Sequence, residues 1–344
     1  MTESNWRRTN FCTQMYPCLL LEVMADVDEE NNVTYEALAD LEQDFEDVEV
    51  EIIRQQYALS KPLYEKREKL VAKIPNFWPL VIEQAPRDID QYIQPSDSAV
   101  LASSLTSVSV SRFEIENGGQ GDPRSICIRM EFSENEYFED KVLEKKFWFR
   151  HHPQGEWLVS EPVPIKWKTG KDLTQGLLDL VVKVWEQDKK KYQILGTRGK
   201  DTSEHPTADE KTLMDKIDTF GLGGVSFFCW FGYHGQYVTA EENAARVERN
   251  KKRRADKAEG KIPEPEEGVN DADFFDTLET GEIFPEGDEL AIAFSDDLWP
   301  NAIKYFKIAQ EAADDDISDI DFEEDGDEDE DDSDEAPPLK KVKT

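Results

Sequence analysis

The chain has 344 residues, which is enough for one substantial domain with tails or for two small domains. It contains 76 Asp and Glu against 40 Lys and Arg, a formal net charge of -36. This excess opposes binding to DNA, RNA or anionic membranes, because phosphate groups are bound by basic surfaces. It favours basic protein partners instead, through an attraction that weakens as salt is added.

The aromatic residues and the cysteines indicate the broad class of the protein. Eighteen Phe, ten Tyr and eight Trp supply enough apolar surface for a folded core. The cysteines at positions 12, 18, 127 and 229 form no Cys-x-x-Cys pair, which favours a reducing compartment. No apolar run approaches the ~20 residues needed to cross a bilayer. We therefore expect a folded, aromatic-rich domain without structural disulfides.

Residues 1–23 differ in character from the acidic sequence that begins at Met24. Arg7 and Arg8 precede a moderately apolar stretch, but polar residues and a proline interrupt it, which disfavours a secretory signal peptide. The acidic sequence from Met24 is typical of a natural start. We interpret residues 1–23 as an extension from an upstream start codon or a gene-model error, and residues 1–33 as a disordered segment. Mass spectrometry of N-terminal peptides tests the first point.

A long amphipathic helix is predicted over residues 34–74, roughly 60 Å at 1.5 Å per residue. Pro62 lacks a backbone donor and is expected to bend it. No single domain of this size easily buries so long and narrow a stripe, and no second helix of matching length follows for an intramolecular hairpin. The sequence therefore predicts a homodimer paired through a coiled coil. The side chains expected at the interface follow a heptad pattern: Leu38, Leu41, Phe45, Val48, Ile52 and Leu59.

Residues 75–310 are predicted to form an α+β domain. Apolar residues alternate over 108–115 and over 126–132, with a glycine-rich loop between them, which indicates an antiparallel pair of strands. Two further strands are expected near Trp148 and Trp157, and a helix over 172–191. The run 226–231 (SFFCWF) is interpreted as core rather than as a binding stripe, because so dense an aromatic cluster needs burial.

Residues 239–285 look like an insertion in this domain. A polar helix is predicted over 240–257, and it contains the basic run 251–254 (KKRR). A solvated insertion helix is the favoured interpretation, and a basic localisation signal is the alternative.

Residues 311–344 are predicted to be a disordered acidic tail. Residues 311–335 contain seventeen Asp or Glu and no Lys or Arg, so the segment has too little apolar surface to fold. Ser318 and Ser333 lie among these carboxylates and are expected substrates of an acid-directed kinase. The last residues reverse sign, and beside two prolines they favour a nuclear import signal formed by Lys340, Lys341 and Lys343.

Five segments together resemble the nucleosome assembly protein family, on its SET-like branch that includes template-activating factors. A long insertion after Phe231 departs from animal relatives and is similar to fungal members. The matching segments occur in family order across residues 34–308: Lys66 and Arg67 followed by 72–78 (AKIPNFW), then 134–143 (ENEYFEDKVL), 165–174 (IKWKTGKDLT), 226–231 (SFFCWF) and 296–306 (DDLWPNAIKYF).

The resemblance implies a headphone-shaped homodimer, in which paired long helices form the band and an α+β "earmuff" domain hangs from each end. Members of the family bind core histones during nucleosome assembly and disassembly, so it also implies a histone chaperone in the nucleus with cytoplasmic shuttling. Some members bind a histone acetyltransferase or inhibit a protein phosphatase. The alternative is therefore a nuclear adaptor or inhibitor of such an enzyme that uses the same fold.

Acidic residues are the candidates for binding basic histones, because carboxylates make charge-assisted hydrogen bonds with Lys and Arg. An ordinary solvated acidic face is the competing interpretation for each of them. Enzymatic activity, a metal site and a cofactor are not expected, since the four histidines lack zinc-site spacing and the phosphate-loop and GxSxG motifs are missing. An apparent calcium loop at 321–332 lacks flanking helices and is attributed to chance. The expected histone-binding residues are Asp288, Glu289, Asp296, Asp297, Glu323, Glu324, Asp325 and Asp327.

Overall fold

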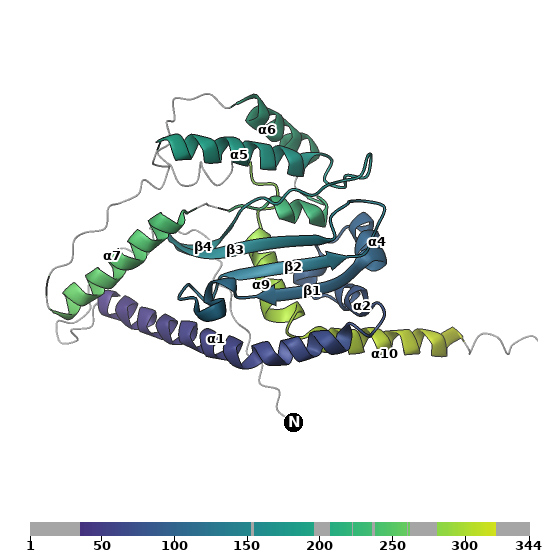
Figure 1. Ribbon diagram of the computed structural model, residues 1–344, viewed down its shortest axis with the longest axis horizontal. Coiled ribbons are helices and arrows are strands. Elements are labelled where there is room, and N and C mark those ends of the chain that lie inside the picture. The colour runs from purple at the N-terminus through teal and green to yellow at the C-terminus, as the bar shows by residue number, and fades with distance from the viewer. Residues whose placement is uncertain are drawn as a thin grey trace, which may run out of the picture. The chain divides into compact units, whose positions relative to one another are not determined.

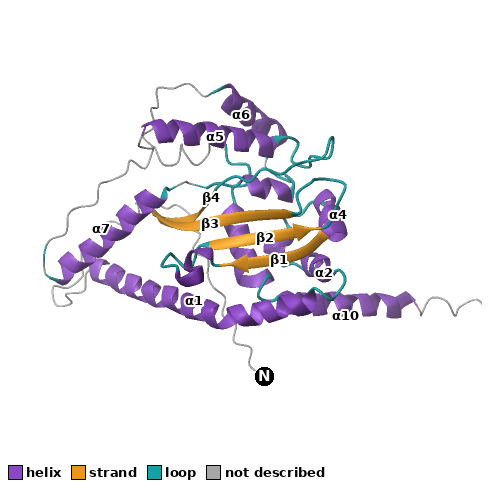
Figure 2. Cartoon of the chain, viewed as in Figure 1, coloured by secondary structure: helices purple, strands orange, loops and turns teal. Residues whose placement is uncertain are grey.

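The computed structural model describes residues 35–152, 155–195, 207–221, 223–235, 238–259, 261 and 281–320. Helices surround a four-stranded antiparallel sheet, so the predicted α+β class is confirmed (Figure 2). The chain divides into two compact units, Met1–Glu49 and Val50–Thr344. The predicted N-terminal segment 1–33, the calcium-like sequence and the terminal basic cluster lie outside the described residues.

The elements follow one another as Figure 1 labels them. The strands are β1 (Leu105–Ser111), β2 (Ile126–Phe132), β3 (Val142–His152) and β4 (Gly155–Ser160). The α-helices are α1 (Tyr35–Val71), α2 (Phe77–Glu83), α3 (Arg87–Asp90), α4 (Pro95–Ser104), α5 (Leu177–Leu195), α6 (Ala208–Phe220), α7 (Ala240–Ala258), α9 (Gly287–Ala293) and α10 (Ala302–Ile320). Three shorter helical turns are η1 (Phe113–Gly118), η2 (Phe227–Gly232) and the π-helical turn η3 (Phe294–Leu298).

The long helix α1 has 37 residues and continues through Pro62. At 1.5 Å per residue it is about 55 Å long. It ends at Val71, slightly before the predicted boundary at 74, because the backbone N–H groups of Lys73 and Ile74 donate to carbonyls three residues back and tighten the last turn. Asn76 then adopts a left-handed conformation (φ 55°) and starts α2 in a new direction.

The four strands pair in the order β1-β2-β3-β4, each antiparallel to the next. Alternation places one set of side chains of β2 in the core, and Ile126, Ile128 and Met130 are each 1% exposed. The predicted pairing of the first two strands and the two further strands are therefore confirmed.

The prediction that the first strand continues to residue 115 is wrong. Phe113 and Ile115 lie in the turn η1 instead. The strand ends because the loop that follows folds back on it: Arg112 donates to the carbonyl of Pro123 at 2.6 Å, and the carboxylate of Glu114 accepts from the hydroxyl of Ser125 at 2.8 Å. Local alternation could not show these longer-range bonds.

The core fills the space between one face of the sheet and its covering helices, with α9 crossing the sheet in Figure 1. The aromatic run of η2 lies at its centre, where Phe227 and Trp230 are fully buried and Phe231 is 1% exposed. The indole of Trp230 donates to the carbonyl of Gly287 at 2.8 Å, which satisfies its polar atom. This burial confirms the interpretation of the run as core. Burying each such side chain contributes about 1.5–3 kcal/mol to stability.

The insertion leaves and re-enters the domain at neighbouring points. The carboxylate of Glu282, near the end of the predicted range 239–285, accepts from the backbone N–H groups of His234 and Gly235, just before that range, at 3.0 and 3.1 Å. The predicted polar helix is present as α7, and it begins with a reciprocal cap between Thr239 and Glu242.

The last helix, α10, packs on α2 through stacked rings of Phe77 and Phe306, with centroids 4.8 Å apart. It continues to Ile320, beyond the boundary at 310 that we expected for the tail. The boundary is corrected accordingly. Ala302, Tyr305 and Ala309 are buried at helical spacing, so one face of α10 packs on the domain up to the start of the acidic sequence.

Candidate functional site

The apolar side chains predicted to pair two copies of the chain are exposed on α1. Single exposed apolar residues are ordinary, but an aligned row along one helix marks an interaction surface. Leu63 and Leu70 extend this row, at 66% and 55% exposed. The exposed fractions of the predicted set are 51% for Leu38 and Leu41, 65% for Phe45, 57% for Val48, 56% for Ile52 and 76% for Leu59. We call the six predicted residues, Leu38, Leu41, Phe45, Val48, Ile52 and Leu59, the apolar seam.

Charge along α1 is divided between its two halves. From Tyr35 to Ile53 the helix carries eight Asp or Glu and no Lys or Arg. From Arg54 to Val71 it carries five Lys or Arg and two Glu. The helix is therefore strongly anionic in its first half and cationic in its second.

The acidic candidates on α9 have different environments. Glu289 is exposed. Asp288 is half-buried, and burial raises its pKa to about 6. Asp288 is therefore less accessible to a cationic partner than the exposed Glu289.

The two acidic candidates on η3 also differ. Asp296 is exposed, and its carboxylate lies 3.5 Å from the guanidinium of Arg112. Asp297 is half-buried and accepts hydrogen bonds from Tyr305 at 2.9 Å and from Asn301 at 2.9 Å. These bonds fix the start of α10, so Asp297 has a structural role whether or not it also contacts a partner.

Of the remaining candidates, only Ser318 lies within the described residues. Ser318 lies in the last turns of α10, and its side chain is not described. The other tail residues lie outside the described residues: Glu323, Glu324, Asp325, Asp327, Ser333, Lys340, Lys341 and Lys343.

A joint between α1 and the sheet was not predicted. Its centre is Glu116, whose Oε1 accepts from the hydroxyl of Tyr57 and the ammonium of Lys61, both at 2.7 Å. The hydrogen bond from Lys61 is the main cause that holds the pKa of Glu116 below its usual range. A hollow of about 140 Å³ lies beside this cluster, between α1 and β1.

Arg67 fixes the other end of this joint. Its guanidinium donates to the backbone carbonyl of Trp299 at 2.5 Å, and its central carbon lies 4.8 Å from the ring of Tyr64 and 4.6 Å from that of Trp299. Such contacts combine cation–π attraction with hydrogen bonding. Arg67 belongs to one of the motifs that carried the family resemblance, but its spacing alone gave no signal of a partner more than two hundred residues away.

Two charged groups in the interior also serve the fold. Asp97 is fully buried and accepts from the hydroxyl of Ser226 at 2.6 Å and the backbone N–H of Phe227 at 2.7 Å. Lys145 is fully buried and donates to three backbone carbonyls, those of Glu161, Phe231 and Tyr233. Burial lowers the pKa of Lys145 to about 7. Both groups tie η2 to the rest of the domain.

The described part of the chain holds no group of three or more His, Cys, Asp or Glu placed to bind a metal ion. Within that part, no helix is long and apolar enough to cross a membrane.

The chain is similar to a described protein family and to named relatives. A family model described as Nucleosome assembly protein (NAP) matches residues 71–308, from the end of α1 into α10. A protein of Schizosaccharomyces pombe named as a nucleosome assembly protein is 38% identical over 150 residues, which covers 40% of this chain and 59% of that protein. Protein SET of Drosophila melanogaster is 37% identical over 130 residues, which covers 37% of this chain and 45% of that protein.

A longer but weaker match reaches nearly the whole chain. Vacuolar protein sorting-associated protein 75 of Saccharomyces cerevisiae is 25% identical over 338 residues, covering 93% of this chain and all of that protein. A crystal structure of Vps75 matches with a TM-score of 0.48 and 22% identity, over 80% of this chain and 98% of that chain. The two more identical relatives are matched over less than two thirds of their own length.

Proposed function

Because the chain belongs to the nucleosome assembly protein family, we propose that it is a histone chaperone, a non-enzymatic protein that binds core histones during nucleosome assembly and disassembly. The observation that carries this proposal is the family match over residues 71–308, which spans the sheet and its covering helices. The similarity to protein SET supports the same branch of the family that the sequence motifs indicated.

The charge of the chain fits basic partners. Histones bind DNA through many arginine contacts, and a chaperone must cover such a surface reversibly. A net charge of -36 attracts histones over a long range. Because each exposed ion pair contributes only about 0–1 kcal/mol, binding requires many pairs at once and weakens strongly with salt.

Within the folded domain, Glu289 and Asp296 are the better placed of the proposed contacts. Both are exposed, whereas Asp288 and Asp297 are half-buried. The proposed set also includes the tail residues Glu323, Glu324, Asp325 and Asp327, which add anionic charge beyond α10.

The apolar seam supports a homodimer, and the charge division along α1 supports an antiparallel one. A parallel pair would place the eight acidic residues of one first half against the same eight of the other. An antiparallel pair instead places each anionic half against a cationic half. Opposite charges that flank an apolar interface set the orientation of paired helices.

The proposal includes nuclear action. Lys340, Lys341 and Lys343 would serve as an import signal beside Pro337 and Pro338. Phosphorylation of Ser318 and Ser333 would add negative charge to a segment that is already anionic, and so would increase its attraction to histones.

Titration of the purified full chain with core histones tests the function. Binding would be measured at two salt concentrations, with the mass of each species determined by light scattering. A dimer that binds histones, weakens with salt and prevents histone–DNA aggregation is the expected result. A dimer that ignores histones at both salt concentrations would overturn the proposal. It would favour the alternative of an adaptor or inhibitor of a nuclear enzyme.

A further inference from the structure

The end of α1 and the turn that follows it carry exposed cations in an otherwise acidic chain. Lys66, Lys69 and Lys73 are exposed, and none of the three forms an ion pair with a residue that the structure describes. Lys73 continues the helical path, since its backbone N–H donates to the carbonyl of Leu70 at 3.2 Å. We call these three lysines the basic end of α1. Like charges three or four residues apart on a helix repel one another, so an anionic partner would stabilise this end.

Helical spacing places the three lysines on one side of α1. At about 100° per residue, they fall within an arc of about 60°. Tyr64, Arg67 and Val71, which pack against the domain, lie on the opposite side of the helix. The exposed apolar row that includes Leu63 and Leu70 runs beside the lysines, about 70° around the helix. The basic end therefore faces away from its own domain and borders the surface proposed to pair two chains.

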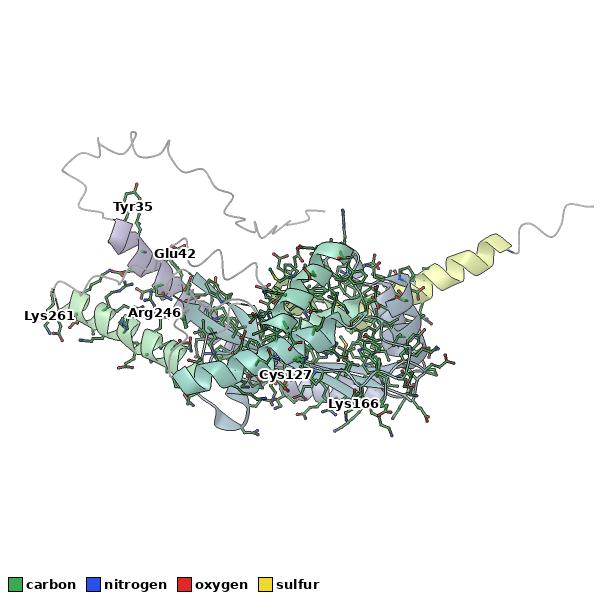
Figure 3. All side chains as sticks on the ribbon, turned by 90° about the horizontal axis from the view of Figure 1, so that it is seen from above. Tyr35, Glu42, Cys127, Lys166, Arg246 and Lys261 are labelled. Atoms are coloured by element: carbon green, nitrogen blue, oxygen red, sulfur yellow. The ribbon has the colours of Figure 1, made fainter. Side chains whose placement is uncertain are left out.

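An acidic segment precedes the other end of α1. Residues 26–30 (DVDEE) contain four Asp or Glu, and residues 24–34 contain no Lys or Arg. The segment leads into Tyr35, the first residue of α1, which Figure 3 labels together with Glu42 two turns further along. The helix between Tyr35 and the basic end is about 55 Å long. The nine residues from position 26 to Tyr35 span at most about 30 Å, so the segment and the basic end of one chain cannot meet.

Pairing with a second copy brings the two together, a step that rests on the antiparallel dimer proposed above. Full overlap of the two helices places the partner's Tyr35 level with Val71. Lys69 and Lys73 then lie about 3 Å to either side of that level along the helix axis. Paired helix axes lie about 8–10 Å apart, and the five residues from Tyr35 back to Glu30 span up to about 17 Å. The partner's acidic segment is therefore within reach of both lysines.

We propose that residues 26–30 of each chain bind the basic end of α1 in the other chain of the dimer, chiefly at Lys69 and Lys73. Carboxylates make charge-assisted hydrogen bonds with ammonium groups, and four carboxylates face the two lysines. Each dimer would hold two such contacts, and they would extend the interface beyond the apolar seam. Because the ion pairs are exposed, their contribution weakens with salt, unlike that of the seam.

The partner's segment fits the basic end better than a nucleic acid does. The net charge of -36 repels the phosphates of DNA or RNA from the protein as a whole. Once the helices have paired, the segment is tethered beside the lysines at an effective concentration of about a millimolar. A chain that acts as a histone chaperone gains from this contact, since covering the lysines leaves that end of the dimer without a surface that repels histones.

Zero-length cross-linking of the full chain tests the contact directly. A carbodiimide joins a lysine amine to a carboxylate only when the two groups touch, and mixing isotope-labelled with unlabelled chains identifies links between chains. Lys69 and Lys73 should link to residues 26–30 of the other chain several-fold more often than the exposed Lys190 and Lys211 do. Equal linkage at all four lysines would overturn the proposal. So would links that join only one chain to itself, or links to the acidic residues of 321–335 in place of 26–30.

A charge exchange between two variants tests the pairing. In the homodimers of K69E/K73E and of D28K/E29K/E30K, like charges meet at both contacts. In a mixed dimer of the two variants, opposite charges meet at both. Native mass spectrometry of the mixture should therefore show mixed dimers in about tenfold excess over random pairing at low ionic strength, and close to random pairing at high ionic strength.

The control replaces the second variant by E186K/D215K/D218K, which carries the same net charge with the reversals at exposed positions of α5 and α6. Mixed with K69E/K73E, it should pair at random. Random pairing in both mixtures would refute the contact, and an equal excess in both would assign the effect to net charge instead. A wild-type chain that stays monomeric would also refute it. Titration of that same chain with core histones decides the proposed function separately, so the two failures are distinguishable.

Discussion

The substitution Ile52→Glu tests the apolar seam at the middle of α1. In an antiparallel pair the two Ile52 side chains lie close to the symmetry axis, since the midpoint of Tyr35–Val71 is residue 53. Ile52 is 56% exposed in the single chain. Covering that surface releases roughly half of the ~3 kcal/mol that full burial of an Ile contributes. Two copies together contribute about 3 kcal/mol, or roughly 100-fold in the dissociation constant of the dimer.

The charge that is introduced should add to this loss, because two carboxylates would face each other in an apolar interface. Sedimentation velocity from nanomolar to micromolar concentration measures the dissociation constant, and circular dichroism checks that the domain stays folded. Ile52→Leu keeps the apolar surface, and Gln56→Glu adds the same charge one turn away, so both controls should remain dimeric. An Ile52→Glu chain with an unchanged dissociation constant would refute the seam as the dimer interface.

Three further predictions concern the interior and the insertion. Asp97→Ala leaves the donors of Ser226 and Phe227 unpaired, so urea unfolding should show a loss of about 3 kcal/mol, and a loss below about 1 kcal/mol would contradict this role. The pKa of about 6 for Asp288 lies above the ordinary value of 3.8, so the folded chain binds more protons than the unfolded chain between those values. The stability of the protein relative to Asp288→Asn should therefore fall as pH rises from 4 to 7, and a constant difference in unfolding free energy would be inconsistent with a buried carboxyl. Replacing residues 240–280 with a short Gly-Ser linker should shift the melting temperature by only a few degrees, because Glu282 closes the base of the insertion; unfolding of that chain would show that α7 supports the core.

Much of the fold follows from local sequence patterns. Heptad spacing predicted the exposed row on α1, and alternation predicted the pairing of β1 with β2. Dense aromatic composition predicted the buried run of η2, including Phe227 and Trp230. These features were predictable because each depends on residues that lie within a few turns or one strand of each other.

The errors and omissions have a common physical cause. Phe113 and Ile115 continue an alternating pattern, yet the fold-back of the loop to Pro123 ends the strand before them. Glu116 bonds to Lys61 across 55 positions, and Asp97 bonds to Ser226 across 129. Hydrogen bonds over such separations depend on the finished fold, and one sequence carries no periodic signal for them.

Some acidic residues hold the fold together through hydrogen bonds, and others lie exposed where they can contact a partner. The net charge alone does not distinguish these two roles. Glu116, Glu282 and Asp97 accept hydrogen bonds that hold α1, the insertion and η2 in place. Glu289 and Asp296 lie exposed, where each contact with a cation contributes about 0–1 kcal/mol. Replacing a carboxylate of the first kind lowers stability and would imitate a binding defect. Replacing one of the second kind changes binding too little to detect alone. The proposed histone binding can therefore be assigned to this surface only through variants that change several exposed charges together and leave the melting temperature unchanged.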